Sequence, residues 1–100
     1  MSNAYAKLIT EDRRLVLLKL LAQSQGYTAN EHLLTSALPG FGHSVSHDRV
    51  RTDLGWLAEQ ELVTLESPGG VSVATLTARG DDVAAGRARV DGVKRPVPGE

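Results

Sequence analysis

The stretch from Ser46 to Leu76 constrains the fold most, because it changes from a helical pattern to a strand pattern across a glycine turn. In its first half, apolar residues recur on one helical face at i, i+4 and i+7: Val50, Leu54 and Leu57. Ser46 precedes them as a helix-capping residue type. Residues 62–65 and 71–76 then have strand composition, and Pro68-Gly69-Gly70 between them predicts a turn. This half of the chain therefore predicts a helix followed by a β-hairpin.

The remaining periodic segments predict three more helices. They cover residues 10–23 capped by Thr10, residues 31–38 capped by Asn30, and residues 78–85 capped by Thr77, with Gly86 as the stop. A strand at Tyr27-Thr28 precedes the second of them. Helix, helix, helix, hairpin, helix is the order of a winged helix-turn-helix, so we predict an α+β fold of this class with a two-stranded β-hairpin wing. We expect an N-terminal segment (1–9), a winged-helix domain (10–86) and a basic extended tail (87–100).

Four sequence segments also resemble one known family. They are Asp48-Arg49-Val50-Arg51-Thr52-Asp53-Leu54-Gly55-Trp56-Leu57, Leu62-Val63-Thr64, Val73-Ala74-Thr75-Leu76-Thr77-Ala78-Arg79-Gly80 and Gly92-Val93-Lys94-Arg95-Pro96. Together they resemble a small winged-helix family encoded in Mu-like prophages, which is similar in fold to the ArsR and MarR regulators. The resemblance covers the chain from Leu8 to Pro96. It implies a phage-derived bacterial protein with an ArsR-like domain.

Composition excludes several classes of function. The chain has no Cys, so disulfides, cysteine-ligated zinc and thiol catalysis are excluded. The apolar run 15–21 contains Lys19 and is too short to cross a bilayer, and nothing resembles a signal peptide, so we expect no membrane association and a cytoplasmic protein. No nucleophile–base pair or phosphate-binding loop is present, so we expect no enzyme activity and no cofactor. The net charge of −1 argues against tight non-specific DNA binding.

The helix that follows Ser46 has the side chains for reading DNA. With Val50, Leu54 and Leu57 facing inward, candidate DNA-binding residues lie on its outward face and flanks: His47, Arg49, Arg51, Thr52 and Gly55. Arg donates bidentately to guanine, and Arg51 is the best candidate for a base contact because it lies on the outward face in the N-terminal half of the helix. The alternative is a solvated face whose Asp48, Arg49, Arg51 and Asp53 pair locally, and Asp48 and Asp53 would repel phosphate.

The hairpin and the tail differ in charge. The turn Glu66–Gly70 has no Lys or Arg, and only Gly70 or Ser67 could offer an N–H or hydroxyl group to a phosphate, so a plain hairpin is the better interpretation. The tail is basic, and Lys94 and Arg95 are candidate phosphate contacts. Docking of the tail on a second subunit is an equal alternative for this segment, and an unstructured terminus is another.

Other side chains have structural interpretations. His43 and His47 are four residues apart and Asp48 follows, but we interpret the two histidines as surface residues and expect no metal site. Phe41 and Val45 are expected to fill the core between helices. Trp56 is expected to pack between the Ser46-capped helix and the hairpin.

Together these features favour a sequence-specific protein that binds double-stranded DNA, a prophage transcription regulator acting as a homodimer. The nearly all-round apolar first helix, with Tyr5, Leu8 and Ile9 before it, predicts the subunit interface. The alternative for this apolar surface is that it packs within the chain, against the last helix and the hairpin. The alternative is a winged-helix module that binds a phage or host protein during phage development or assembly. Fold alone does not decide between the two.

Overall fold

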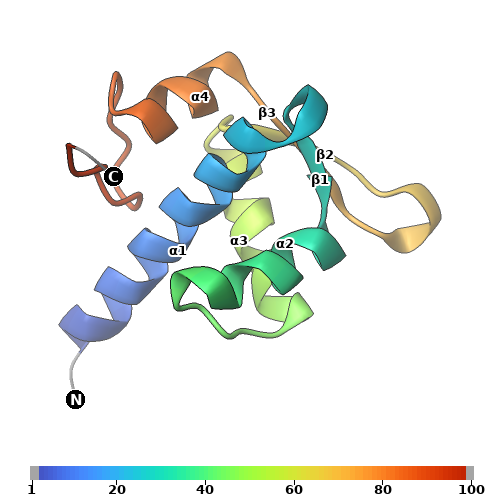
Figure 1. Ribbon diagram of the computed structural model, residues 1–100, viewed down its shortest axis with the longest axis horizontal. Helices are drawn as coiled ribbons and strands as arrows, with labels where there is room; N and C mark the ends of the chain where they lie inside the picture. The colour runs from blue at the N-terminus through green and yellow to red at the C-terminus, as the bar shows by residue number, and fades with distance from the viewer. Residues whose placement is uncertain (1–2, 99–100) are drawn as a thin grey trace.

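Four α-helices pack together with a small antiparallel sheet at one side of them in the computed structural model, which describes residues 3–98 (Figure 1). The helices are α1 (Asn3–Gln23), α2 (Glu31–Ala37), α3 (His47–Glu59) and α4 (Ala78–Ala85). The strands are β1 (Thr28–Asn30), β2 (Val63–Glu66) and β3 (Val73–Leu76). Short 3-10 turns lie between them: η1 (Gln25–Tyr27), η2 (Leu38–Phe41) and η3 (Pro68–Gly70). The predicted α+β class is confirmed.

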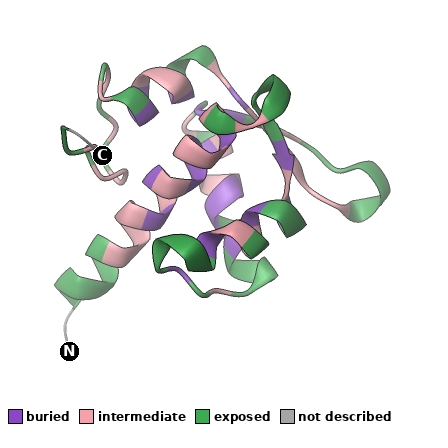
Figure 2. Cartoon of the chain, viewed as in Figure 1, coloured by how far each residue is buried: buried purple, intermediate pink, exposed green. Residues whose placement is uncertain are grey.

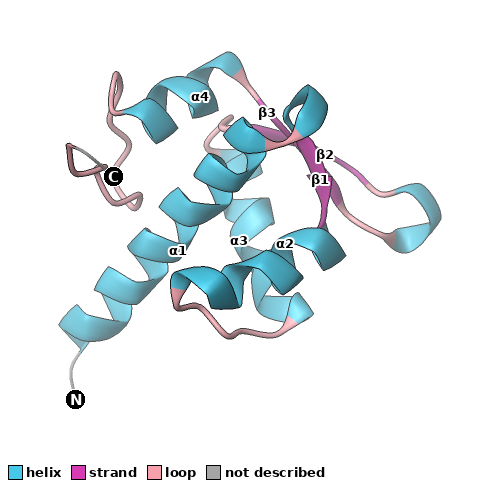
Figure 3. Ribbon diagram, viewed as in Figure 1, coloured by secondary structure: helices cyan, strands magenta, loops and turns pink. Residues whose placement is uncertain are grey.

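The sheet has the strand order β1-β3-β2, and all its pairs are antiparallel (Figure 3). The predicted hairpin is present, with Val63 of β2 opposite Leu76 of β3. β3 begins at Val73, later than predicted, because the N–H and C=O groups of Ser72 bond to Glu31 instead. β1 begins at Thr28, because Tyr27 has a φ of +58°, which an extended strand does not allow.

Three predicted helix caps are confirmed. Side-chain oxygens of Asn30, Ser46 and Thr77 accept hydrogen bonds from backbone N–H groups in the first turns of α2, α3 and α4. At the end of α4, Gly86 adopts the left-handed conformation expected of a stop signal. These ends are local features, so the sequence was sufficient to place them.

The start of the first helix was predicted wrongly. α1 begins at Asn3, so the segment 1–9 is helical as far as it is described, and Thr10 lies inside the helix. The Thr10 hydroxyl donates to the carbonyl oxygen of Ala6 at 3.0 Å, one turn back. Residues 4–9 contain no Gly or Pro, so the helix extends upstream past the capping residue.

Leucine side chains from α1, α2 and α3 form most of the core. Figure 2 colours the buried positions of these helices purple. The largest fully buried side chains are Leu17, Leu18, Leu21, Leu34, Leu38, Leu54, Leu57 and Leu62. Phe41, predicted to fill the core, is 53% exposed, because Pro39-Gly40 continues the chain through the η2 turn and carries it outward. Val45 packs against the core as expected. His43, two residues earlier, is also buried.

Gly80 allows α4 to pack closely against the start of the hairpin. A Cβ atom at this position would lie 2.0 Å from the carbonyl oxygen of Leu62, so only glycine fits. The Leu76-Thr77-x-x-Gly80 element thus combines a cap with a close helix–strand contact, since the Gly80 N–H also donates to the Thr77 hydroxyl. Among residues 3–98, no helix is long and apolar enough to cross a membrane.

Candidate nucleic-acid interface

α3 lies on the outside of the domain with a polar face turned to solvent. Its buried residues include Val50, Leu54 and Leu57, as predicted. Its exposed residues include four of the candidate DNA contacts: His47, Arg49, Arg51 and Thr52. The fifth, Gly55, is half-buried, and no atom lies within 4 Å of where its Cβ would be, so a larger side chain or a partner could approach here. The N-terminal half of α3 is therefore available to a partner.

Arg51 connects three parts of this surface. Its Nε lies 3.0 Å from the carboxylate of Glu31 at the start of α2, and its Nη2 donates to the carbonyl oxygen of Gly70 at the hairpin tip. No hydrogen bond from its Nη1 is formed within the described residues. The Arg51 side chain is half-exposed, so the guanidinium is held in place while part of it faces solvent.

Glu31 is the buried centre of this connection, with only 3% of its surface exposed. Its carboxylate accepts the Ser72 N–H at 2.6 Å, and the Ser72 carbonyl accepts the Glu31 N–H at 2.8 Å. The Ser72 hydrogen bond and the Arg51 guanidinium hold the pKa of Glu31 below its ordinary value, although burial opposes this shift. α2, α3 and the hairpin are thus joined through one carboxylate.

The Gly70 backbone acts differently from the sequence-based expectation. Its N–H, the group expected to reach a phosphate, donates to the Ser67 carbonyl at 3.1 Å and closes the turn. Its carbonyl oxygen accepts from Arg51. Gly70 therefore orients Arg51, and its own N–H is used inside the hairpin.

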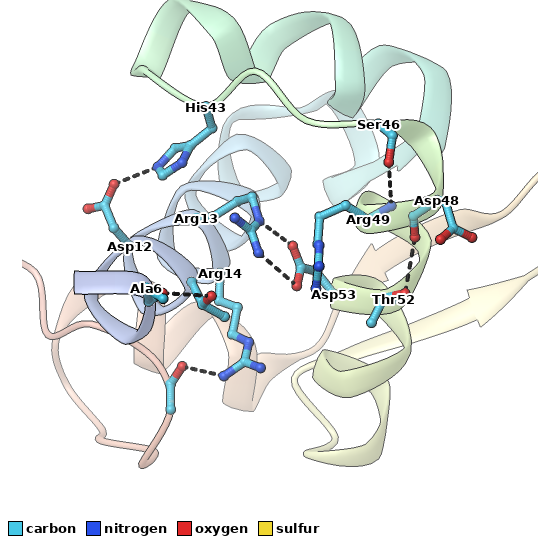
Figure 4. A network of polar contacts seen from close by, with 12 residues as sticks. Ala6, Asp12, Arg13, Arg14, His43, Ser46, Asp48, Arg49, Thr52 and Asp53 are labelled. Carbon is cyan, nitrogen blue, oxygen red and sulfur yellow. Dashed lines mark hydrogen bonds and ion pairs between the residues drawn. The ribbon is translucent and has the colours of Figure 1, made fainter. Parts of the chain in front are cut away.

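A buried ion pair joins α1 to α3. Arg13 Nε donates to a carboxylate oxygen of Asp53, and Arg13 is 4% and Asp53 1% exposed (Figure 4). The sequence interpretation, in which Asp53 repels phosphate or pairs within its own helix, is wrong because Asp53 points into the domain. A signal was available, since Asp53 lies three residues after buried Val50 and four before buried Leu57, and Arg13 lies four residues before buried Leu17.

The three histidines fall into two different settings. His43, predicted to lie at the surface, is 7% exposed, and its Nε2 lies 2.7 Å from Asp12 of α1. His47 is exposed, and its Nε2 lies 2.9 Å from Nδ1 of His32 on α2. Within residues 3–98, no group of three His, Cys, Asp or Glu side chains is arranged to hold a metal ion.

The C-terminal segment (residues 87–98) folds back on α1 of its own chain. The Lys94 N–H donates to the Glu11 carbonyl at 3.1 Å, and Lys94 Nζ lies 3.3 Å from Asp12. Burial alone would raise the pKa of Asp12, but the hydrogen bonds from His43 and Lys94 outweigh it, and the pKa lies below its ordinary value. Lys94, a candidate phosphate contact, is thus already paired, whereas Arg95 is exposed.

Trp56 packs in this region instead of beside the hairpin. The Arg14 guanidinium carbon lies 3.8 Å from the centre of its ring, and Arg14 Nη1 donates to the Gly92 carbonyl at 2.9 Å. Burial lowers the pKa of Arg14 from its ordinary value. A Cβ at Gly92 would lie 2.6 Å from the Trp56 ring, so the backbone passes directly over the aromatic side chain. α1, α3 and the C-terminal segment meet here.

The chain is similar over most of its length to two known proteins. It is 56% identical to the uncharacterized protein gp26 of Escherichia phage Mu over 91 residues, which cover 91% of this chain and 94% of that protein. It is 46% identical over 77 residues to an uncharacterized protein of Haemophilus influenzae (strain ATCC 51907 / DSM 11121 / KW20 / Rd), covering 76% of this chain and 74% of that protein. No protein-family model and no solved structure matches the chain.

Proposed function

This chain belongs to the family of the phage Mu protein gp26, and we propose that it is a sequence-specific DNA-binding protein that regulates transcription as a dimer. In this proposal the domain is a winged helix-turn-helix of the ArsR or MarR kind, with α2 and α3 as the helix pair and β2–β3 as the wing. The observation that carries the proposal is the solvent-facing N-terminal half of α3, which the Ser46 cap and the Arg51–Glu31 ion pair hold beside the hairpin.

Arg51 is the proposed base reader. The major groove admits a helix, and an Arg at its N-terminal end donates to O6 and N7 of guanine. The contacts of Arg51 with Glu31 and Gly70 restrict its rotamers before binding, so less conformational entropy is lost on contact with a base. His47, Arg49 and Thr52 lie on the exposed surface around it and would contact neighbouring bases or phosphates.

The proposal is tested by selecting bound duplexes from a pool of random sequence and measuring their dissociation constants. Arg51→Ala should weaken the selected duplex by about 1–3 kcal/mol and relax the preference at one base pair. Arg79→Ala is the control for the loss of an exposed Arg, since Arg79 lies on α4 and donates to the Gln60 carbonyl at the C-terminal end of α3, away from its N-terminal half. If no sequence is enriched, or if Arg51→Ala folds normally and binds unchanged, α3 is not a reader.

We propose that the dimer forms through the outer face of α1. Tyr5 and Leu8 are 67% and 63% exposed on the part of the helix that projects from the domain (Figure 1). Half-buried Val16 and Leu20 continue the same face toward Phe41 around a groove of about 530 Å³. Leu8→Glu should shift sedimentation at micromolar concentration from dimer to monomer, and a monomeric native protein would contradict the proposal.

A second candidate function, a protein-interaction module, is favoured by one observation. Residues 63–76 contain no Lys or Arg, and the charged side chain among them is Glu66, so the hairpin has little attraction for phosphate. Exposed apolar side chains lie elsewhere on the surface: Tyr27, Leu33 and Phe41. This function would be favoured if the selection enriched no DNA duplex and if a protein partner that binds the native protein no longer bound Leu33→Glu.

A further inference from the structure

A groove of about 1030 Å³ lies between the N-terminal half of α1 and the C-terminal segment. α1 contributes Lys7 and Arg14 to its lining, and the C-terminal segment contributes Arg89, Lys94 and Arg95. This side of α1 is distinct from the outer face that carries Tyr5 and Leu8. The groove could therefore bind a ligand while the outer face of α1 contacts another molecule.

Positive charge is concentrated in this groove. Five of the eleven Lys and Arg residues of the chain line it, but only two of the twelve Asp and Glu residues do, Glu11 and Asp91. Because the whole chain has a net charge of −1, the rest of the molecule has an excess of carboxylates. Such a separation makes a positive potential that attracts polyanions.

Several of these cations are accessible. Arg89 and Arg95 are exposed, and neither has an ion-pair partner within residues 3–98. The Lys7 side chain is 75% exposed, and its Nζ is 4.0 Å from Glu11, a weak pair in water. Lys94 differs, because its contact with Asp12 fixes the segment in place. Lys7, Arg89 and Arg95 are therefore the groups that a ligand would meet.

The groove is formed before any ligand binds. Arg14 stacks on Trp56 and bonds to the Gly92 carbonyl, and Lys94 bonds through its backbone to Glu11 (Figure 4 shows Arg14). Arg14 Nε is buried and has no hydrogen-bond partner in the described part of the chain. A preformed cationic surface binds an anion at a lower entropic cost than a flexible tail does.

The groove adjoins the proposed reading face. Trp56 lies in the groove lining and follows Thr52 by four residues, one turn along α3. DNA that takes α3 into its major groove brings a sugar-phosphate strand along the flank of that helix. The hairpin, which contains no Lys or Arg, cannot supply the cations that such a strand requires.

We propose that the groove between α1 and the C-terminal segment binds the phosphate backbone of duplex DNA. The inference rests on the proposed DNA-binding function and adds a second contact surface to it. Arginine is suited to this role, because its planar fork donates two hydrogen bonds to phosphate oxygens. Contacts of this kind position the duplex without reading its sequence.

The test compares two double variants with the same change in charge. Arg89→Ala with Arg95→Ala removes two groove cations, and Arg79→Ala with Arg87→Ala removes two exposed cations outside the groove lining. Dissociation constants are measured by fluorescence anisotropy between 50 and 200 mM salt, for the selected duplex and for an unrelated duplex of the same length. The groove variant should bind both duplexes about tenfold to thirtyfold more weakly, and its salt slope should fall by about 2.

The outcomes separate this inference from the proposed function. If the groove variant binds like the control variant while Arg51→Ala weakens the selected duplex, the groove is overturned and DNA binding stands. If the native protein binds no duplex, the proposed function fails and the groove inference fails with it. If poly-glutamate of equal charge displaces the duplex as efficiently as unlabelled duplex does, the groove takes an acidic polypeptide, and its assignment to phosphate is overturned.

Discussion

Removing one partner of the Arg13–Asp53 ion pair should strongly destabilise the domain. Both side chains are almost completely buried, so Asp53→Asn leaves the Arg13 guanidinium without its counter-charge inside the protein. Breaking a buried pair in this way costs about 3–5 kcal/mol. Domains of this size have a total unfolding free energy of about 5–15 kcal/mol, so the loss is a large fraction of it.

Urea unfolding followed by circular dichroism measures this loss. With a slope of about 2 kcal/mol per molar urea, Asp53→Asn should lower the unfolding midpoint by about 2 M. Glu59→Gln is the matched control, because it neutralises an exposed carboxylate on the same helix and should change stability by less than about 0.5 kcal/mol.

A double variant separates charge from packing. Arg13→Met with Asp53→Leu replaces both charges by apolar groups of similar size and should recover most of the stability lost by Asp53→Asn. If Asp53→Asn lowers the unfolding free energy by less than about 1 kcal/mol, leaving the buried Arg13 guanidinium without its counter-charge is not strongly destabilising, contrary to this prediction. If the free energy lost in the double variant equals the sum of the losses in Arg13→Met alone and Asp53→Leu alone, lost packing and not an unpaired charge explains the effect.

Three further results are expected. Gly80→Ala should destabilise the domain by about 1–3 kcal/mol in urea unfolding, because the added Cβ would lie 2.0 Å from the Leu62 carbonyl oxygen. An unchanged unfolding midpoint would contradict this close packing. Because the pKa of Asp12 is lowered in the folded state, its charged form stabilises the domain above the unfolded-state pKa of about 4. This stability is lost as the pH falls through the folded-state pKa. The difference in unfolding free energy between the native protein and Asp12→Asn should therefore shrink on acidification. A difference that stays constant between pH 5 and pH 2 would contradict this pairing. Gly92→Ala should displace the C-terminal segment from the ring of Trp56, the one Trp of the sequence, and shift its fluorescence, and an unshifted spectrum would oppose that contact.

Sequence rules sufficed where the interacting residues are close in the chain. The caps at Asn30, Ser46 and Thr77 and the stop at Gly86 depend on groups within a few residues of one another, and the strands of the β2–β3 hairpin are joined by a short turn. The inward face of α3 followed from helical period for the same reason. Thr10 was misplaced as a cap, because the residues before it also favour a helix.

Only the tertiary structure decided which distant side chains meet. Arg13 and Asp53 are 40 residues apart, and Arg51 and Glu31 are 20 apart, so no local rule pairs them. Arg and Glu side chains are long and reach partners on several elements, whereas a cap or a hairpin turn allows few geometries. The fold likewise placed the C-terminal segment on α1 through the Lys94–Glu11 backbone bond, and Gly92, which has no Cβ, lets the backbone pass over Trp56. The sequence by itself therefore determined most of the helices and the hairpin but not the start of α1 or of β3, and the packing of α1 against α3 and the C-terminal segment decided which charges remain exposed for a partner.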